Sequence, residues 1–161
     1  MSDELIAALA QALQTRGEWL ATAESCTGGM IAAQITDRAG SSAWFERGLV
    51  TYSNLAKTEL LGVEPVLLAE HGAVSQACAE AMARGLLRAC PVDWGVAVTG
   101  IAGPGGGTPD KPVGTVWIAW IQRGQRPQAH RFGFEGDRAS VRAQAAQAAL
   151  EGLLYRIGEA G

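Results

Sequence analysis

The apolar residues of this chain follow two repeat lengths, and the two alternate along the sequence. Residues 3–16 place Leu5, Leu9 and Leu13 four apart, which predicts a helix with one buried face. Residues 113–121 form a nearly continuous apolar run, which is typical of a buried strand. The same criteria, with the positions of Gly, Pro, Ser and Asn, predict helices over 3–16, 28–37, 54–61, 65–71, 76–89 and 138–157. They predict strands over 19–22, 47–52, 93–98, 113–121 and 128–134.

The order of these elements indicates the fold class. Helices and strands alternate early in the chain, and a hairpin with its turn at 123–125 comes late. Alternation favours parallel strands covered by helices on both faces, and the hairpin adds an antiparallel pair. We therefore expect an α/β protein, a three-layer α/β/α sandwich on a mixed, mostly parallel sheet, with residues 1–161 forming a single domain.

Composition and charge argue against several classes of function. The net charge of −3 does not suit a duplex-binding protein, so we expect no nucleic-acid partner. No apolar run approaches the roughly 20 residues that span a bilayer, so we expect no membrane association. Cys26, Cys78 and Cys90 are far apart, and without a signal peptide they indicate a reduced, cytoplasmic protein. Together with His71 and His130 they show no metal-ligand spacing, and we expect neither a metal nor a cofactor.

The segment 24–29 joins a predicted strand to a predicted helix and contains two glycines in succession. Backbone N–H groups at such a helix start, with the hydroxyls of Ser25 and Thr27, suit a bound phosphate. A simple helix cap by either hydroxyl is the alternative, but a cap has no need of the double glycine that begins at Gly28. Cys26 at the helix start is a candidate nucleophile, although a small buried residue is the more common role.

A second group of candidates consists of Ser41 and Ser42, followed by Tyr52 and Lys57. A serine hydroxyl is inert until a base takes its proton, and a buried lysine with a lowered pKa can act as that base. Taken singly, the serines are typical of a turn, the tyrosine of a half-buried strand and the lysine of a solvated helix face. Any contact among them depends on the fold.

Thr99 and Gly100 begin a long glycine-rich loop. The loop fits neither a dinucleotide fingerprint nor a Walker A motif, because prolines and a strand follow it. A long loop inside a compact domain is more often functional than a passive connection, and a threonine at a strand end suits a ligand or oxyanion contact. Arg138 and Arg142, near the start of the last predicted helix, are candidate phosphate ligands; the alternative is a solvated surface with Asp137 as the helix cap.

Taken together, these segments resemble the CinA C-terminal domain family. The matching stretches are AESCTGG (23–29), AGSSAWFERG (39–48), VTYSN (50–54) with Lys57, HGAVS (71–75), TGIAGP (99–104), KPVGTVW (111–117) and GDR (136–138). They extend over nearly the whole chain. The stand-alone members of that family are nicotinamide mononucleotide (NMN) amidohydrolases, also called NMN deamidases.

The resemblance implies metal-free hydrolysis of NMN to nicotinate mononucleotide and ammonia, in pyridine nucleotide salvage. It also implies a five-stranded mixed sheet and a homodimer or higher homo-oligomer. The family's serine nucleophile falls on Ser42, with Ser41 as the open alternative, its lysine base on Lys57 and the tyrosine of its proton relay on Tyr52. The expected substrate-binding residues are Ser25, Cys26, Thr27, Gly28, Thr99, Gly100 and Arg138.

Two other functions stay open. One is a cysteine-dependent hydrolase that uses Cys26. The other is a non-catalytic nucleotide-binding sensor or interaction module, which the competence and damage-inducible context of the family suggests. The family loop usually carries an acidic residue where this chain has Gly105, so we expect weaker activity or a shifted substrate if that acid matters.

Overall fold

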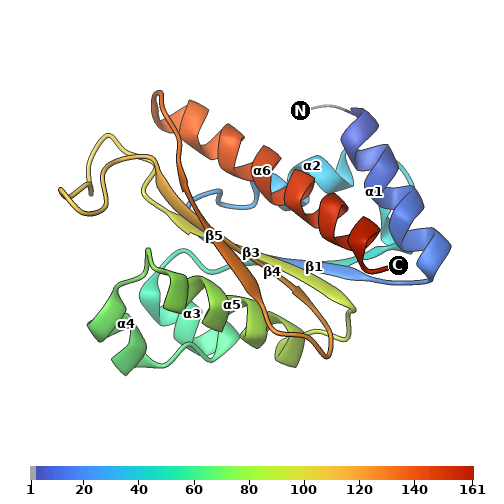
Figure 1. The fold of residues 1–161 in the computed structure, drawn as a ribbon, viewed down its shortest axis with the longest axis horizontal. Coiled ribbons are helices and arrows are strands. Elements are labelled where there is room, and N and C mark those ends of the chain that lie inside the picture. Colours follow the sequence, from blue (N-terminus) through green and yellow to red (C-terminus); the bar gives the residue numbers. More distant parts are fainter. Residues whose placement is uncertain (1–2) are drawn as a thin grey trace.

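The computed structural model describes residues 3–161. One five-stranded sheet forms the middle layer, with helices on both of its faces (Figure 1). The strands are β1 (Leu20–Glu24), β2 (Phe45–Val50), β3 (Trp94–Gly100), β4 (Thr115–Gln122) and β5 (Gln128–Gly133). The helices are α1 (Asp3–Arg16), α2 (Met30–Thr36), the short 3-10 helix η1 (Ser41–Ala43), α3 (Asn54–Leu61), α4 (Pro65–His71), α5 (Gln76–Ala89) and α6 (Arg138–Glu159).

The strands lie in the order β2-β1-β3-β4-β5. β1 pairs in parallel with both β2 and β3, and β4 pairs antiparallel with both β3 and β5. Four strands therefore point the same way and β4 alone runs against them. This confirms the predicted α/β class and the mixed, mostly parallel sheet.

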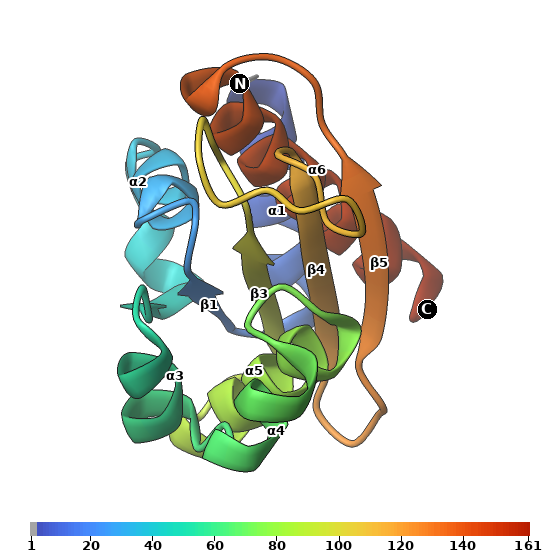
Figure 2. The same cartoon turned by 90° about the vertical axis from the view of Figure 1, so that its left-hand side faces the viewer.

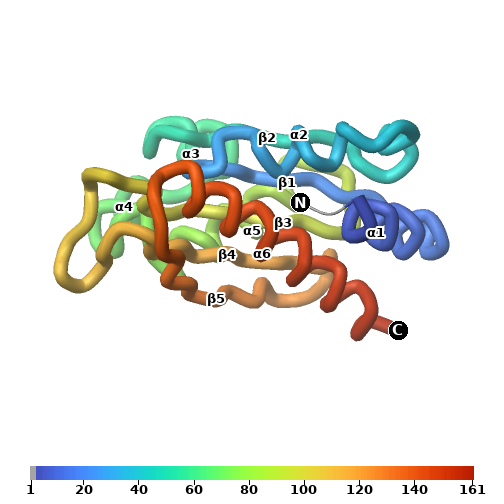
Figure 3. Tube along the Cα trace, turned by 90° about the horizontal axis from the view of Figure 1, so that it is seen from above, coloured from blue at the N-terminus to red at the C-terminus, as the bar shows by residue number. Residues whose placement is uncertain are grey.

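The two helical layers differ in which side chains of the sheet they cover. Alternate strand residues, such as Leu20, Val98 and Ile118, face the layer of α1, α2 and α6. The residues between them are mostly small, such as Ala23 and Ala97, and they face α5. Seen from above, α6 runs along the sheet with α1 and α2 beside it (Figure 3).

The carboxyl ends of β1, β2 and β3 meet at one edge of the sheet, where α/β proteins commonly bind their ligands. Figure 2 looks onto this end of the molecule, where the long loop after β3 crosses in front of the strands. Ladder pairing carries β1 to Glu24, opposite Val50 and Val98, which is two residues further than the sequence predicts. Thr99 and Gly100 likewise belong to β3 rather than to the loop.

Two further boundaries differ from the prediction. α2 begins at Met30 rather than at residue 28, because Gly28 and Gly29 have φ values of 59° and 104°, outside the helical region. The 3-10 helix η1 was not predicted. A single turn of this kind leaves no periodic pattern in the sequence.

Candidate active site

A cavity of about 300 Å³ opens at the carboxyl ends of β1, β2 and β3. Residues from the turn after β1, the start of α3, the loop after β3 and the start of α6 line it. Of the expected site residues, it is lined by Ser25, Cys26, Tyr52, Lys57, Thr99, Gly100 and Arg138. The fold thus gathers segments that are more than a hundred residues apart into one site.

Lys57 is buried, with 1% of its surface exposed. It lies in α3, whose start is capped by the Ser53 hydroxyl. The amine donates to the carbonyl oxygens of Thr51 at 3.1 Å and Tyr52 at 3.2 Å, and its third contact is the Ser25 hydroxyl at 3.0 Å. Burial lowers the pKa of Lys57 from its usual value, because a desolvated ammonium is disfavoured.

These contacts orient the lone pair of a neutral Lys57 amine. Two backbone carbonyls only accept hydrogen bonds, so they hold the two N–H groups of the neutral amine. The remaining direction, toward Ser25 Oγ, is then left for the lone pair. Ser25 and Lys57 thus have the geometry of a nucleophile and its base.

Ser25 follows β1 directly, and its N–H donates to Val98 in the neighbouring strand at 3.0 Å. Ser25 is 7% exposed and lines the cavity. The sequence predicts Ser25 as a substrate-binding residue, with Ser42 as the nucleophile. The contact with Lys57 was not predicted, because the two residues are 32 positions apart and α3 brings them together.

The expected pairing of Lys57 with Ser42 is not present in the structure. Ser42 is exposed in η1, which precedes β2, whereas Lys57 follows the opposite end of that strand. Ser41, its predicted alternative, is buried beside Ser42 in the same short helix. Neither serine lines the cavity, and the Lys57 amine contacts Ser25 instead.

The backbone of Tyr52 binds the Lys57 amine, and its ring lies at the mouth of the cavity. The Tyr52 carbonyl accepts from Lys57, and it also lies 3.4 Å from the Ser25 hydroxyl. The side chain is 60% exposed, and its hydroxyl accepts from Arg138 at 3.1 Å. The phenol therefore does not contact Lys57, contrary to the predicted relay.

Arg138 bridges two walls of the cavity mouth. It donates to the Gly103 carbonyl at 2.8 Å and to the Tyr52 hydroxyl at 3.1 Å. The Thr99 hydroxyl donates to the Ala73 carbonyl at 2.9 Å, which ties the end of β3 to the segment before α5. Both residues are where the sequence predicts them, at the cavity.

The predicted phosphate site at the start of α2 is filled by the protein itself. The buried Glu24 carboxylate accepts hydrogen bonds from the N–H groups of Gly29, Ile31 and Ala32 at 3.2, 2.9 and 3.0 Å. These three N–H groups are therefore not free to bind a phosphate. Neither the Ser25 hydroxyl nor the Thr27 hydroxyl caps the helix. Thr27 and Gly28 do not line the cavity.

Cys26 lines the cavity but is a poor nucleophile. Burial raises the pKa of the Cys26 thiol to about 11, so the reactive thiolate is scarce near neutral pH. The structure thus gives no support to a hydrolase that uses Cys26.

The sequence prediction missed several residues of the site. Asn54, Ala73, Val74, Ile101, Ala102, Gly103 and Gly106 also line the cavity. Most of them contribute backbone or small side chains, which leave no chemical signature. Glu24 could have been found, because a carboxylate just before a helix start is a common cap.

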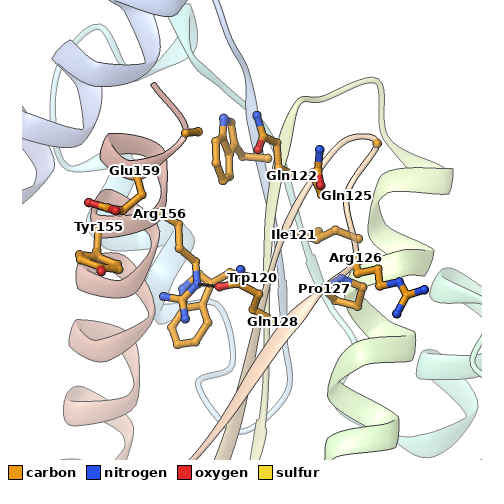
Figure 4. Close-up of a pocket in the computed structure, with 13 residues that line it drawn as sticks. Trp120, Ile121, Gln122, Gln125, Arg126, Pro127, Gln128, Tyr155, Arg156 and Glu159 are labelled. Atoms are coloured by element: carbon orange, nitrogen blue, oxygen red, sulfur yellow. Dashed lines mark hydrogen bonds between the residues drawn. The ribbon is translucent and has the colours of Figure 1, made fainter.

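A larger cavity of about 950 Å³ lies at the opposite end of the sheet, between the end of α6 and the β4–β5 hairpin (Figure 4). Its walls include Trp120, which Arg156 covers at 3.8 Å from the ring centroid, and the amides of Gln122 and Gln128. No serine, threonine, cysteine or lysine lines it. It therefore lacks the serine hydroxyl and the lysine amine that line the smaller cavity.

Two features are absent from residues 3–161: a membrane-spanning helix and a cluster of metal ligands. No helix in that range has the length and apolar character needed to cross a bilayer. No three potential metal ligands among its His, Cys, Asp and Glu residues gather in one place.

The chain matches the model of the CinA C-terminal domain over residues 2–157. It is 59% identical over 133 residues to the nicotinamide-nucleotide amidohydrolase PncC of Pseudomonas putida, covering 83% of this chain and 82% of that protein. It is 54% identical over 143 residues to PncC of Escherichia coli (strain K12), covering 89% of this chain and 87% of that protein. The competence damage-inducible protein A (ComA) of Klebsiella pneumoniae subsp. pneumoniae MGH 78578 has the same fold, with a TM-score of 0.92 and 44% identity over 96% of both chains. These matches confirm the family that the motifs predicted: the chain belongs to the CinA C-terminal domain family.

Proposed function

We propose that this protein hydrolyses the carboxamide of NMN to nicotinate mononucleotide and ammonia, in pyridine nucleotide salvage, with Ser25 as nucleophile and Lys57 as base. The observation that carries the proposal is the 3.0 Å contact between the buried Lys57 amine and the Ser25 hydroxyl. The names of the P. putida and E. coli relatives support the substrate. The cavity of about 300 Å³ is large enough for a small ligand.

The first half of the proposed reaction forms an ester and releases ammonia. The Ser25 oxygen attacks the carboxamide carbon while its proton passes to the neutral Lys57 amine. The resulting ammonium of Lys57 then gives that proton to the departing –NH2 group as the C–N bond breaks. Ammonia leaves, and nicotinate mononucleotide stays bound to Ser25 as an ester.

The second half uses the same two residues. A water molecule attacks the ester carbonyl and transfers a proton to Lys57, and the proton returns to the Ser25 oxygen as the ester bond breaks. The product acid leaves, and both residues regain their starting state.

The backbone of the turn and the mouth of the cavity supply the remaining parts. We assign oxyanion binding to the Cys26 N–H, the backbone donor directly after the proposed nucleophile. Arg138 at the mouth is the proposed phosphate ligand, since a guanidinium binds phosphate in a bidentate manner. The exposed Tyr52 ring beside it is suited to stack on the cationic pyridinium.

The proposal is tested by ammonia release from NMN. We expect the wild-type protein to be active and Ser25→Ala to lose on the order of 10³-fold or more in kcat. Ser42→Ala is the matched control and should keep its activity, because Ser42 does not line the cavity. Loss of activity in Ser42→Ala alone would restore the sequence prediction, and loss in Cys26→Ala alone would favour a cysteine nucleophile. NMN binding without any turnover by the wild type would favour the sensor function.

We also propose that the protein is cytoplasmic and forms a homodimer or higher homo-oligomer, as the family resemblance implies. Light scattering after gel filtration measures the mass directly. A single species at the 16.8 kDa of one chain would refute the oligomer.

A further inference from the structure

The turn that carries Ser25 is held from two sides, and we propose that Glu24 and Arg142 are the positioning residues that hold it. Glu24 binds N–H groups at one end of the turn, and Arg142 binds carbonyl groups in its middle. The inference rests on the proposed function, because it takes Ser25 as the nucleophile. Neither side chain lines the cavity, so both act through the backbone.

Glu24 connects the two partners of the catalytic pair. Its carboxylate, in a residue that is 1% exposed, binds the N–H groups of Gly29, Ile31 and Ala32 at the start of α2. Its own carbonyl accepts from the Thr51 N–H at 2.8 Å, and the Thr51 carbonyl in turn accepts from the Lys57 amine. A buried carboxylate with three charge-assisted bonds resists displacement. Glu24 therefore links the turn after β1 to the backbone that orients Lys57.

Arg142 holds the turn from α6. Its Nε donates to the Cys26 carbonyl at 3.1 Å, and its Nη2 donates to the Thr27 carbonyl at 3.2 Å. In a trans peptide the carbonyl and the next N–H point in opposite directions, so fixing these two carbonyls fixes both peptide planes. The sequence predicts Arg142 as a phosphate ligand; in the structure these two donors hold the turn instead.

Gly28 fits this arrangement. Its φ is +59°, and a Cβ at this position would lie 3.3 Å from Arg142 Nη2. A side chain would therefore strain the backbone and crowd the guanidinium. Gly28, which the sequence predicts at a phosphate site, thus allows the approach of Arg142 to the turn.

The proposed role is positional because the turn has little other support. Residues 25–29 belong to no helix or strand. Of the backbone bonds described for residues 25–29, three stay within the turn and the start of α2: Gly28 N–H to Ser25, Met30 N–H to Thr27 and Ala33 N–H to Gly29. The bond from Ser25 N–H to Val98 connects the turn to a neighbouring strand. The reaction needs the Ser25 oxygen within reach of both Lys57 and the carboxamide carbon. A displacement of about 1 Å costs on the order of 10²-fold in rate.

The test compares two variants at the turn with two matched variants at the other end of the sheet. Glu24→Gln and Arg142→Lys weaken the two contacts, since an amide accepts with one oxygen and an ammonium lacks the planar fork. Asp93→Asn is the control for the first, because Asp93 accepts from the Trp19 N–H at 2.8 Å. Arg123→Lys is the control for the second, because Arg123 donates to the carbonyls of Leu87, Cys90 and Val92 at 2.7 to 2.9 Å.

Four quantities are measured for each variant: kcat and KM for NMN, the folded fraction by circular dichroism, and the rate at which a fluorophosphonate labels Ser25. We expect Glu24→Gln and Arg142→Lys to lose about 10- to 100-fold in kcat and in labelling rate per folded molecule, with KM nearly unchanged. The controls should lose stability but keep both rates. The double variant should lose less than the product of the single losses, because the two residues hold the same turn.

Rates per folded molecule in Glu24→Gln and Arg142→Lys that equal those of the controls would overturn the inference. If Glu24→Gln does not fold, Glu24→Asp keeps the charge but shortens the reach, and a wild-type rate in that variant would also overturn it. Labelling separates this inference from the substrate proposal. A wild type that releases no ammonia but is labelled at Ser25 refutes only the substrate, whereas an unlabelled Ser25 refutes the positioning role as well.

Discussion

At the scale of single residues, the site depends on one lysine that is removed from water. A solvated lysine is an ammonium near neutral pH and cannot accept a proton. The amine of Lys57 is desolvated, which raises the free energy of its charged form. This desolvation is the first cause of the lowered pKa, and the nearby charged groups do not offset it. The lowered pKa on which the proposed base depends therefore follows from burial rather than from a neighbouring charge.

The first prediction at this scale concerns the pH dependence of activity. Lys57 works as a base only when neutral, so kcat/KM should rise with pH through the lowered pKa of Lys57 and level off above it. Initial rates of ammonia release across a pH series measure this. A profile with its midpoint at or above the usual lysine value would contradict a lowered pKa.

The second prediction concerns stability and its dependence on pH. The folded-state pKa of Lys57 lies below the unfolded value, so the unfolded chain binds more protons between the two. The free energy of unfolding of the wild type should therefore fall as the pH drops from the unfolded-state pKa of Lys57 to its folded-state pKa. Below the folded-state pKa the whole of this loss in stability is present. Lys57→Met has no proton to bind and should be more stable than the wild type at neutral pH, with the difference shrinking at alkaline pH. Urea unfolding at both pH values measures it, and a difference independent of pH would refute the explanation.

At the scale of elements, the loop after β3 forms one wall of the site and is held by side-chain contacts with other elements. Arg138 in α6 donates to Gly103, Lys111 donates to the His71 carbonyl of α4 at 2.9 Å, and Arg131 in β5 donates to Asp110 at 2.8 Å. These contacts give a long glycine-rich segment a defined path over the cavity.

Two glycines of this loop give a matched pair of substitutions. Gly103 has a φ of +84° and a Cβ there would lie 2.5 Å from Val113, so Gly103→Ala should lower the free energy of unfolding by more than about 1 kcal/mol. Gly105 has open space around it and no positive φ, so Gly105→Ala should raise it by about 0.4–1 kcal/mol. Denaturant titration of both variants checks the opposite signs. Equal effects would mean that the loop does not keep this conformation in solution.

At the scale of the whole molecule, the sheet separates two cavities. The smaller one collects the carboxyl ends of three strands and the reactive side chains, and the larger one lies beyond the other end. The family model and the ComA structure extend over nearly the whole chain, so the fold that assembles the site is shared.

Substrate binding should be visible in the stability of the whole molecule. NMN at 100 times its Kd should stabilise the inactive Ser25→Ala protein by about 2.7 kcal/mol, which raises Tm by several degrees. Adding Arg138→Gln should remove most of this shift, since Arg138 is the proposed phosphate ligand. Thermal melting with and without NMN provides the measurement. A full shift in the double variant would place the phosphate elsewhere.

Much of the fold could be predicted from the sequence because it depends on local patterns. α1, α3, α4 and α5 begin and end at the predicted residues, although Ser53 rather than Asn54 caps α3. The alternation of elements also predicted the layers and the mixed sheet. The boundaries that were missed, at Glu24 and Thr99, depend on pairing between strands, which no local pattern records.

The residue types of the site were likewise apparent in the sequence, but not their partners. Lys57, Tyr52, Arg138 and Thr99 were predicted at the site and line the cavity. Only the tertiary structure decided that Lys57 contacts Ser25 rather than Ser42, because η1 and the start of α3 lie at opposite ends of β2. It also decided that the start of α2 binds Glu24 rather than a phosphate, since a buried carboxylate already takes its N–H groups. Local sequence determines which chemical groups are present and how their segments fold, whereas the distances between them depend on how those segments pack.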